Sequence, residues 1–194
     1  PLNTFVGQVK AFDLDKTNEN NLTLYKFFIH SDEDLFNLDR TTGVLTVFNR
    51  DRLDRELNEK FNLTIVAYNP NRANELFDTT NVIIILNDLN DQIPEFDQPI
   101  YQVYIREKLN RLPYSILNLT AHDLDLKENG TILYELVKAK DSGITDLFSI
   151  NRKTGQLYLN AYLDADLDET RPVFEFEVRA KDMGGLSSKT TIQV

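Results

Sequence analysis

The sequence contains an internal repeat, and this repeat limits the possible architecture more than any other feature. The segment 36–45, Phe-Asn-Leu-Asp-Arg-Thr-Thr-Gly-Val-Leu, returns at 148–157 as Phe-Ser-Ile-Asn-Arg-Lys-Thr-Gly-Gln-Leu. Two further matches keep the same order: 11–15 with 121–125, and 61–67 with 174–180. Three collinear matches indicate two copies of one domain of about 110 residues, which is a common domain size.

Both copies carry the residue alternation that is typical of β-strands. In residues 174–180 apolar side chains alternate with charged ones, which places the two kinds on opposite faces of a strand. Residues 61–67 show the same alternation in the first copy, and shorter runs occur at 101–105 and 132–136. Several short strands separated by turn residues predict an all-β sandwich in each copy.

Turn and linker signals divide the chain further. Gly43 and Gly155 each follow a threonine, and we expect tight turns there because glycine tolerates positive φ. The charged stretch 51–60 has no broad apolar stripe, so we expect a loop with at most one helical turn. The segment 87–99 is polar and contains two prolines. Because proline cannot extend a central strand, this segment predicts a linker.

Composition excludes several classes of function. The chain has 31 acidic and 21 basic residues and a net charge of −10, which argues against nucleic acid and anionic membranes as partners. It has no cysteine, which excludes disulfides, zinc–thiolate sites and cysteine nucleophiles. The longest apolar run, 82–86, is far too short to span a membrane. The motifs of a serine-hydrolase elbow and of a glycine-rich phosphate loop are not found.

The acidic residues form short clusters that suit a hard cation. Calcium takes six to eight oxygen ligands, and no single short loop of this sequence supplies that many. The candidates are Asp54 and Glu56, then Asp88, Asn90 and Asp91 in the linker, and Asp123, Asp125 and Asp182 in the second copy. Each residue taken singly is more typical of a turn than of a metal site. The clustering along the chain therefore raises calcium binding as a hypothesis, which requires these clusters to converge in space.

An ordered set of motifs resembles the cadherin superfamily. Residues 53–56, Leu-Asp-Arg-Glu, are identical to a motif of cadherin repeats, and 88–96, Asp-Leu-Asn-Asp-Gln-Ile-Pro-Glu-Phe, are similar to the linker that joins such repeats. Residues 121–125, Ala-His-Asp-Leu-Asp, and 180–182, Ala-Lys-Asp, match two further motifs. The resemblance spans nearly the whole chain, keeps the family's order, and points to inner repeats of a long or protocadherin-like cadherin.

The resemblance implies two tandem seven-strand Greek-key sandwiches, joined end to end by a calcium-binding linker. We expect one repeat at 1–94, without its opening strand, and one at 95–194, without its C-terminal end. Three calcium ions are implied at the junction. By analogy Asp54, Glu56, Asp88 and Asp91 serve the first two ions, Asn90, Asp123, Asp125 and Asp182 mainly serve the third, and Leu89, Gln92 and Asn129 contribute backbone carbonyls or lie near the ions.

The chain departs from the family pattern at several positions. Gln92 replaces the usual last asparagine of the linker, a mild change if its carbonyl is what binds. The family also uses a glutamate in the first strand of a repeat; in the second copy it is Glu107, and its counterpart in the first copy would precede Pro1. Asn69 and Asp166 stand where the family has Asp and Glu, which predicts weaker sites at the outer junctions.

The implied function is a calcium-rigidified cell-adhesion module rather than an enzyme. It would lie outside the cell, in a larger single-pass membrane protein whose partners are adjacent repeats and other cadherin ectodomains, homophilic or heterophilic. One alternative is a calcium-binding scaffold in a secreted non-adhesive protein. Another is a glycan-binding or hydrolytic sandwich, for which the acidic residues 164–169 offer carboxylates, although a solvated loop explains them better.

Four glycosylation sequons are present, which an extracellular chain can use. They begin at Asn21, Asn62, Asn118 and Asn129. Asn62 is the best candidate because it alternates outward between Phe61 and Leu63. Asn129 is the poorest if its loop wraps an ion.

Overall fold

The computed structural model describes residues 4–13, 23–28, 34–70, 76–106, 109, 111–137, 143–163 and 173–194. The predictions for Glu107, the sequon at Asn21 and residues 164–169 therefore lie outside the described residues. The chain divides into two compact units, Pro1–Asn87 and Asp88–Val194. Residues 88–94 are thus part of the second unit, and the repeat boundary at 94/95 stays a prediction.

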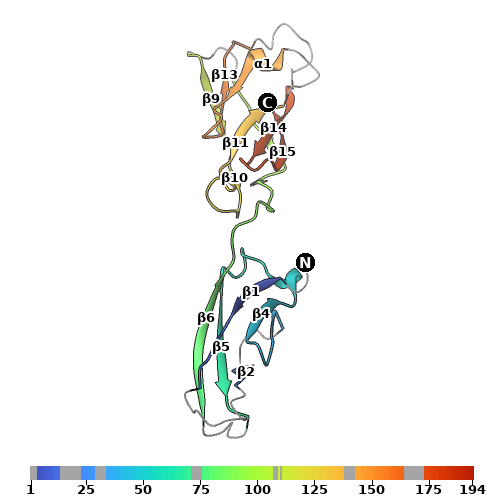
Figure 1. Cartoon of the computed structure of the whole chain (residues 1–194). Coiled ribbons are helices and arrows are strands. Elements are labelled where there is room, and N and C mark those ends of the chain that lie inside the picture. The colour runs from blue at the N-terminus through green and yellow to red at the C-terminus, as the bar shows by residue number, and fades with distance from the viewer. Residues whose placement is uncertain are drawn as a thin grey trace. The chain divides into compact units, whose positions relative to one another are not determined.

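The first unit contains six strands in its described residues (Figure 1). They are β1 (Phe5–Gln8), β2 (Leu24–Phe27), β3 (Phe36–Leu38), β4 (Val44–Val47), β5 (Lys60–Tyr68) and β6 (Phe77–Ile85). One sheet has the order β1-β4-β3 and the other the order β2-β5-β6, with antiparallel pairing throughout. The short 3-10 helix η1 (Arg50–Arg52) lies between β4 and β5. It confirms the prediction of at most one helical turn in the charged stretch.

The second unit repeats this architecture with additional strands. It contains β7 (Glu95–Phe96), β8 (Ile100–Gln102), β9 (Tyr114–Asn118), β10 (Ala121–His122), β11 (Leu133–Leu136), α1 (Ile144–Leu147), β12 (Phe148–Ile150), β13 (Gln156–Leu159), β14 (Glu175–Lys181) and β15 (Ser187–Gln193). Its sheets have the orders β9-β13-β12 and β11-β14-β15-β8, and β7 pairs with β10. The predicted all-β fold is confirmed.

The two units place corresponding strands in the same order. The sheet β1-β4-β3 of the first unit corresponds to β9-β13-β12 of the second, and β2-β5-β6 corresponds to β11-β14-β15. The repeat in the sequence is therefore a repeat in topology. Both units are Greek-key β-sandwiches, and in each the chain crosses from one sheet to the other several times.

The repeated aromatic residues form the centre of each core. Phe36 meets Phe61 edge-on, with ring centroids 5.6 Å apart, and its counterpart Phe148 meets Phe174 at 5.7 Å. Phe148 also contacts Phe176 at 4.9 Å. Phe36 and Phe148 are each 1% exposed, so these contacts lie within fully buried clusters. Because each sheet directs alternate side chains inward, the alternation seen in the sequence builds these cores.

The Thr-Gly positions form the tight turns predicted from the sequence. Gly43 has φ +68° and Gly155 has φ +71°, in the left-handed region that favours glycine. Asp39 accepts hydrogen bonds from the backbone amides of Thr41 and Thr42 at 2.9 and 2.7 Å. Asn151 does the same in the second unit, accepting from the amides of Lys153 and Thr154. Both copies thus hold the turn with a side-chain oxygen in the same place.

The prediction of a strand over the whole of 101–105 was wrong, and a short strand within the predicted linker was not foreseen. The alternating run 101–105 forms a strand only as far as Gln102, although the amide of Val103 still donates to the carbonyl of Gln193 at 2.9 Å. The predicted linker 87–99 is not wholly irregular, because β7 forms within it and pairs with β10. Pro94 precedes β7 and therefore interrupts no ladder. His122 lies in β10, with its exposed ring 3.0 Å from Asp97.

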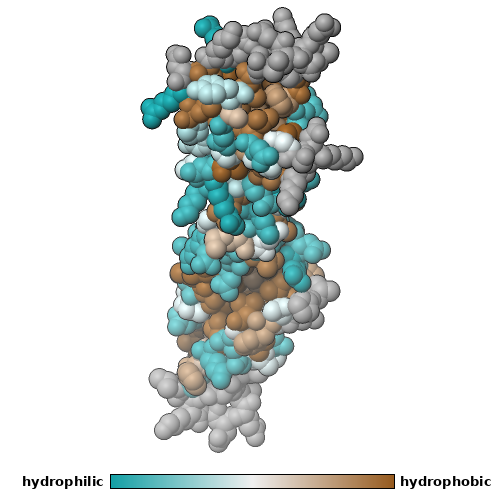
Figure 2. All heavy atoms as spheres, turned by 90° about the horizontal axis from the view of Figure 1, so that it is seen from above, coloured by the Kyte–Doolittle hydropathy of each residue, from teal (hydrophilic) through white to brown (hydrophobic). Residues whose placement is uncertain are grey.

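The surface mixes hydrophilic and hydrophobic patches, as Figure 2 shows. Scattered exposed apolar side chains are normal on a folded protein, and a contiguous group is more informative. Such a group lies on the outer face of β5 and β6, where Ile83 and Ile85 are 64% and 59% exposed. Among the described residues no helix has the length and apolar character needed to cross a bilayer.

Candidate metal centre

The loop that follows β10 places two carboxylates next to each other. The backbone amide of Asp125 donates to Asp123 Oδ1 at 2.9 Å, which folds the segment back on itself. Gly130 closes the loop: a Cβ at this position would lie 2.2 Å from the carbonyl oxygen of Asp125. Any larger residue would push the loop open, so the shape of the acidic loop depends on this glycine.

A third carboxylate comes from the end of β14. Asp182 is 2% exposed, and its Oδ1 accepts hydrogen bonds from the backbone amides of Gly185 and Leu186. These bonds fix the side chain after the strand ends. One carboxylate oxygen from each of Asp123, Asp125 and Asp182 lies within 4.8 Å of the others. Three acidic side chains, from two segments far apart in the sequence, therefore converge inside the second unit.

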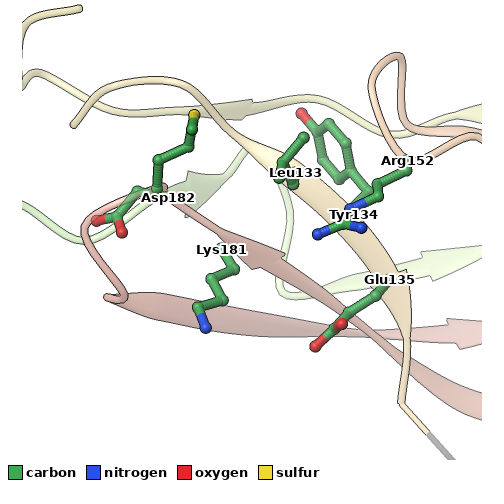
Figure 3. A pocket seen from close by; sticks show the side chains of 7 residues that line it. Leu133, Tyr134, Glu135, Arg152, Lys181 and Asp182 are labelled. Carbon is green, nitrogen blue, oxygen red and sulfur yellow. The ribbon is translucent and has the colours of Figure 1, made fainter. Parts of the chain in front are cut away.

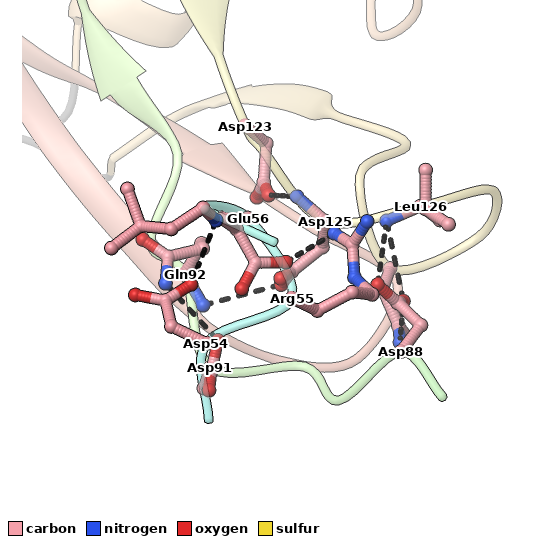
Figure 4. A network of polar contacts seen from close by, with 11 residues as sticks. Asp54, Arg55, Glu56, Asp88, Asp91, Gln92, Asp123, Asp125 and Leu126 are labelled. Atoms are coloured by element: carbon pink, nitrogen blue, oxygen red, sulfur yellow. Dashed lines mark hydrogen bonds and ion pairs between the residues drawn. The ribbon is translucent and has the colours of Figure 1, made fainter. Parts of the chain in front are cut away.

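Residues 88–92 run alongside this acidic loop (Figure 4). The carboxylate of Asp88 accepts from the amide of Leu126 at 3.1 Å and from Asn129 Nδ2 at 2.9 Å. The backbone amide of Gln92 donates to Asp125 Oδ2 at 3.2 Å, and Gln92 Nε2 donates to Asp91 Oδ1 at 3.1 Å. The segment is thus held against the loop by its own polar groups.

The side chain of Asn90 lies in a space that is open only because residue 184 is a glycine. A Cβ at Gly184 would lie 2.3 Å from Cγ of Asn90. The absence of a side chain at position 184 therefore admits the carboxamide of Asn90 beside the turn that follows Asp182. The sequence predicted Asn90 as a ligand but gave no role to Gly184. The Met-Gly-Gly run after Asp182 was the available signal, because consecutive glycines allow close approach of another segment.

The polar atoms of this cluster suit a cation. Four buried oxygens of this cluster have no hydrogen-bond partner among the residues that the structure describes, and they belong to Asn90, Asp123, Asp125 and Asp182. A buried oxygen without a donor is costly and calls for an explanation such as a water or an ion. Burial raises the pKa of Asp125, and the neighbouring carboxylates of Asp123, Asp88 and Asp91 raise it further, against the lowering effect of the Gln92 amide. A donor set of carboxylate and amide oxygens fits a hard divalent cation.

The predicted ligands of the first unit lie just after η1. Asp54 Oδ1 accepts from the backbone amide of Leu57 at 3.1 Å, which closes a turn. Glu56 forms an ion pair with the neighbouring Arg55. Both residues thus lie in one turn of the first unit.

The structure therefore brings together most of the predicted residues of the second unit. The carbonyl of Leu89 accepts from the amide of Asp91 at 2.9 Å while the side chain of Leu89 is exposed, so this residue offers backbone rather than side chain. Asn129 uses its amide nitrogen on Asp88. The roles of all these residues as ligands stay predictions.

A shallow hollow of about 240 Å³ lies beside Asp182 (Figure 3). Its carboxylates have structural partners: Glu135 pairs with Arg179 at 2.9 Å, and Asp182 accepts from the turn amides. The hydroxyl of Tyr134 accepts from the amide of Ala121. The lining comprises Leu133, Tyr134, Glu135, Arg152, Lys181, Asp182 and Met183.

Comparison with known proteins identifies the class of protein that these features define. A sequence model of the family described as Cadherin domain matches residues 1–87 and 101–194. Human "Protocadherin Fat 1" is 34% identical over 191 residues, which cover 96% of this chain and 4% of that protein. Pig "Protocadherin-11 X-linked" is 30% identical over 191 residues, covering 98% of this chain and 16% of that protein.

A solved structure agrees with this class at the level of the fold. The structure titled "Crystal Structure of Mouse Cadherin-23 EC22-24" matches with a TM-score of 0.85 and 24% identity, covering 100% of this chain and 58% of that chain. The chain belongs to the cadherin family and carries two cadherin domains. Cadherin domains are extracellular adhesion modules and not enzymes, which confirms the predicted family, location and non-enzymatic class. The chain spans a small part of the curated relatives that it matches.

Proposed function

We propose that this pair of domains is a calcium-rigidified strut of an adhesion protein. The observation that carries the proposal is the convergence of Asp123, Asp125 and Asp182, with carboxylate oxygens that are buried and without a hydrogen-bond donor among the described residues. Three carboxylates this close repel one another, and burial strengthens the repulsion because it removes the screening by water. A divalent cation would remove this repulsion and would give the oxygens without donors a partner.

The ligands that we propose come from both domains. Asp123, Asp125, Asp182 and Asn90 serve one ion, since they supply the oxygens that lack donors. Asp88 and Asp91 serve two further ions together with Asp54 and Glu56 of the first domain. Leu89, Gln92 and Asn129 add backbone carbonyls or support the loop. Bound calcium supplies positive charge and oxygen coordination at these carboxylates.

The mechanical consequence follows from the chain's own residues. The linker segment 88–92 already hydrogen-bonds to the acidic loop through Asp88 and Gln92. If Asp54 and Glu56 of the first domain are tied to the same ions, the hinge between the domains becomes stiff. We expect the linker to be flexible and protease-sensitive when the carboxylates are left uncompensated.

The parent protein and its partners belong to the same proposal. The matched relatives are named as a protocadherin Fat and a protocadherin. We infer that the chain is part of a long single-pass membrane cadherin, which binds other cadherin ectodomains in a homophilic or heterophilic manner. The alternative of a secreted, non-adhesive calcium scaffold predicts calcium binding without adhesion, so a bead-aggregation assay distinguishes the two.

Thermal unfolding with and without calcium tests the proposal. Extracellular calcium modules bind at about 10⁻⁴–10⁻³ M, and ligand at ten times its dissociation constant stabilises by about 1.4 kcal/mol per site. For a domain of this size about 1 kcal/mol raises the melting temperature by roughly 4–8 °C. We therefore expect millimolar calcium to raise the melting temperature of the intact chain by several degrees relative to excess chelator.

Two charge-matched variants make the test specific. Asp123→Asn removes one converging carboxylate and is expected to abolish most of the rise. Asp146→Asn removes the same charge from α1, where the residue is exposed and outside the cluster, and is expected to keep the rise. An equal loss in both variants, or no rise in the unmodified chain, would show that the cluster is not a calcium site.

A further inference from the structure

The outer face of the sheet β2-β5-β6 in the first domain differs from its counterpart in the second domain. In the second domain this face is polar: Arg179 pairs with Glu135 at 2.9 Å, and Lys189 pairs with Glu177 at 2.8 Å. Gln193 adds a hydrogen bond to Glu175 at 2.8 Å. Charged and polar side chains therefore cover this face of the second domain along β11, β14 and β15.

The first domain exposes apolar side chains on the corresponding face. Ile83 and Ile85 of β6 are 64% and 59% exposed, and Phe28, which follows β2, is 51% exposed. Directly opposed residues of antiparallel strands share a face, so the pairing Asn62↔Ile83 places Asn62 beside Ile83. The amide of Phe28 donates to the carbonyl of Thr64 at 2.8 Å, which places Phe28 opposite Thr64, on the same face as Asn62 and two residues further along β5. These three apolar residues form the outer strip.

Asn62 lies in the middle of the outer strip and begins the sequon Asn62-Leu63-Thr64. Its side chain is exposed, whereas Phe61 and Leu63 on either side are buried in the core. It forms no hydrogen bond with another residue in the part of the chain that the structure describes, so its amide nitrogen is available. The corresponding position in the second domain is Glu175, which begins no sequon. The modification signal thus lies beside the exposed isoleucines of this face, where Lys60 opposes Ile85.

The other described sequons have different surroundings. Asn129 is half-buried, and its Nδ2 donates to Asp88 at 2.9 Å, so the folded acidic loop already uses the nitrogen that a sugar would take. Asn118 is exposed at the end of β9 and opposes Gln156, whose own amide donates to Ser115 at 2.7 Å. A sugar at Asn118 would therefore lie over polar groups and would cover no apolar strip.

We propose that Asn62 carries an N-linked glycan whose first sugars cover the strip formed by Phe28, Ile83 and Ile85. In the transfer, Asn62 Nδ2 forms a bond to C1 of the sugar of a lipid-linked oligosaccharide diphosphate. The C1–O bond breaks, the lipid diphosphate leaves with the electron pair, and a base accepts the proton lost from Nδ2. The apolar C–H faces of the sugar rings cover the strip, and their hydroxyl groups face water.

Mass spectrometry of the chain secreted from a eukaryotic host tests the modification. We expect the peptide that contains Asn62 to carry a glycan, which peptide-N-glycosidase removes with conversion of Asn to Asp. Asn62→Gln is expected to lose one glycan, and Thr64→Ser to keep it because serine also completes a sequon. An unmodified Asn62 peptide in the secreted protein overturns the proposal and leaves the strip open for a protein partner.

Binding of a hydrophobic fluorescent dye tests the covering role. Asn62→Gln and the enzymatically deglycosylated protein are both expected to give higher dye fluorescence than the glycosylated chain at an unchanged melting temperature. Adding Ile83→Thr and Ile85→Thr to Asn62→Gln is expected to remove that increase. Equal fluorescence with and without the glycan would overturn the covering role. The inference rests on the extracellular location and not on calcium, so the calcium-dependent rise in melting temperature is expected in every variant.

Discussion

At the scale of single residues, the acidic cluster depends as much on glycines as on carboxylates. Asp123, Asp125 and Asp182 are recognisable in the sequence because calcium chemistry requires oxygen ligands. Gly130 and Gly184 are not recognisable as part of a site, because their contribution is the space that a missing side chain leaves. The residue types that can bind calcium can be read from the sequence. The close approach of two segments at a glycine can be seen only in the folded chain.

Gly184→Ala is expected to weaken calcium binding without unfolding the second domain. The added Cβ would lie 2.3 Å from Cγ of Asn90 and would displace that side chain from its position beside residue 184. Loss of groups that orient a metal site typically costs 10–100-fold in affinity, so we expect calcium affinity to fall by roughly tenfold or more. Isothermal titration of the intact chain with calcium measures the change.

Gly143→Ala is the matched control for this substitution. A Cβ at Gly143 would meet no atom within 4 Å, so calcium affinity is expected to stay the same. Unchanged affinity in Gly184→Ala would mean that Asn90 does not contribute to binding from the position that the structure shows.

At the scale of elements, the turn that joins β3 to β4 shows how the two copies use different residues for one task. Asp39 accepts from the amides of Thr42 and Thr41 and from the hydroxyl of Thr41, and these hydrogen bonds hold its pKa well below the ordinary value for aspartate. Asn151 accepts the equivalent amide bonds in the turn between β12 and β13. Asp39 is charged and Asn151 is not, so the two turns can be compared to measure what the charge contributes to the stability of the turn.

Asp39→Asn is expected to lower the melting temperature slightly at neutral pH, because hydrogen bonds to a charged acceptor are stronger. A lowered folded-state pKa contributes stability above the unfolded pKa, about 3.9, and this contribution is lost as the pH falls through the folded-state value. The difference between the unmodified chain and the variant should therefore be constant near neutrality and shrink below about pH 4. Thermal unfolding across this pH range measures it.

Asn151→Asp provides the reciprocal test in the second domain. It is expected to raise stability near neutrality and to lose that gain over the same acidic range. A difference that grows on acidification in either variant would show that the carboxylate does not stabilise the turn in its charged form.

The strands themselves were predictable where one face is buried. The alternation at 61–67 and 174–180 corresponds to β5 and β14, whose inward residues include Leu63 and Val178 at 0% exposure. The run 101–105 has the same alternation, but β8 covers only Ile100–Gln102. The short β7 was missed because a two-residue strand depends on its partner β10 rather than on a local pattern. Local periodicity predicts long paired strands, and the partner decides where short ones form.

At the scale of the whole molecule, the repeat in the sequence predicted the architecture of both domains but not the difference between their surfaces. The matched sheet orders follow from repeated core residues such as Phe36 and Phe148. The apolar outer strip of the first domain and the ion pairs of the second involve outward residues, which the repeat leaves free to vary. Convergence of the acidic residues could be predicted within one domain only through the family resemblance, because no local pattern specifies it.

The central claim, that calcium stiffens the junction between the domains, is tested most directly by single-molecule energy transfer. The chain has no cysteine, so Asn37→Cys and Lys153→Cys, at exposed positions in the first and second domains, give one dye site in each. The account predicts a narrow distance distribution in millimolar calcium and a broad one in chelator, with Asp123→Asn broad in both. Distributions of equal width with and without calcium would contradict it.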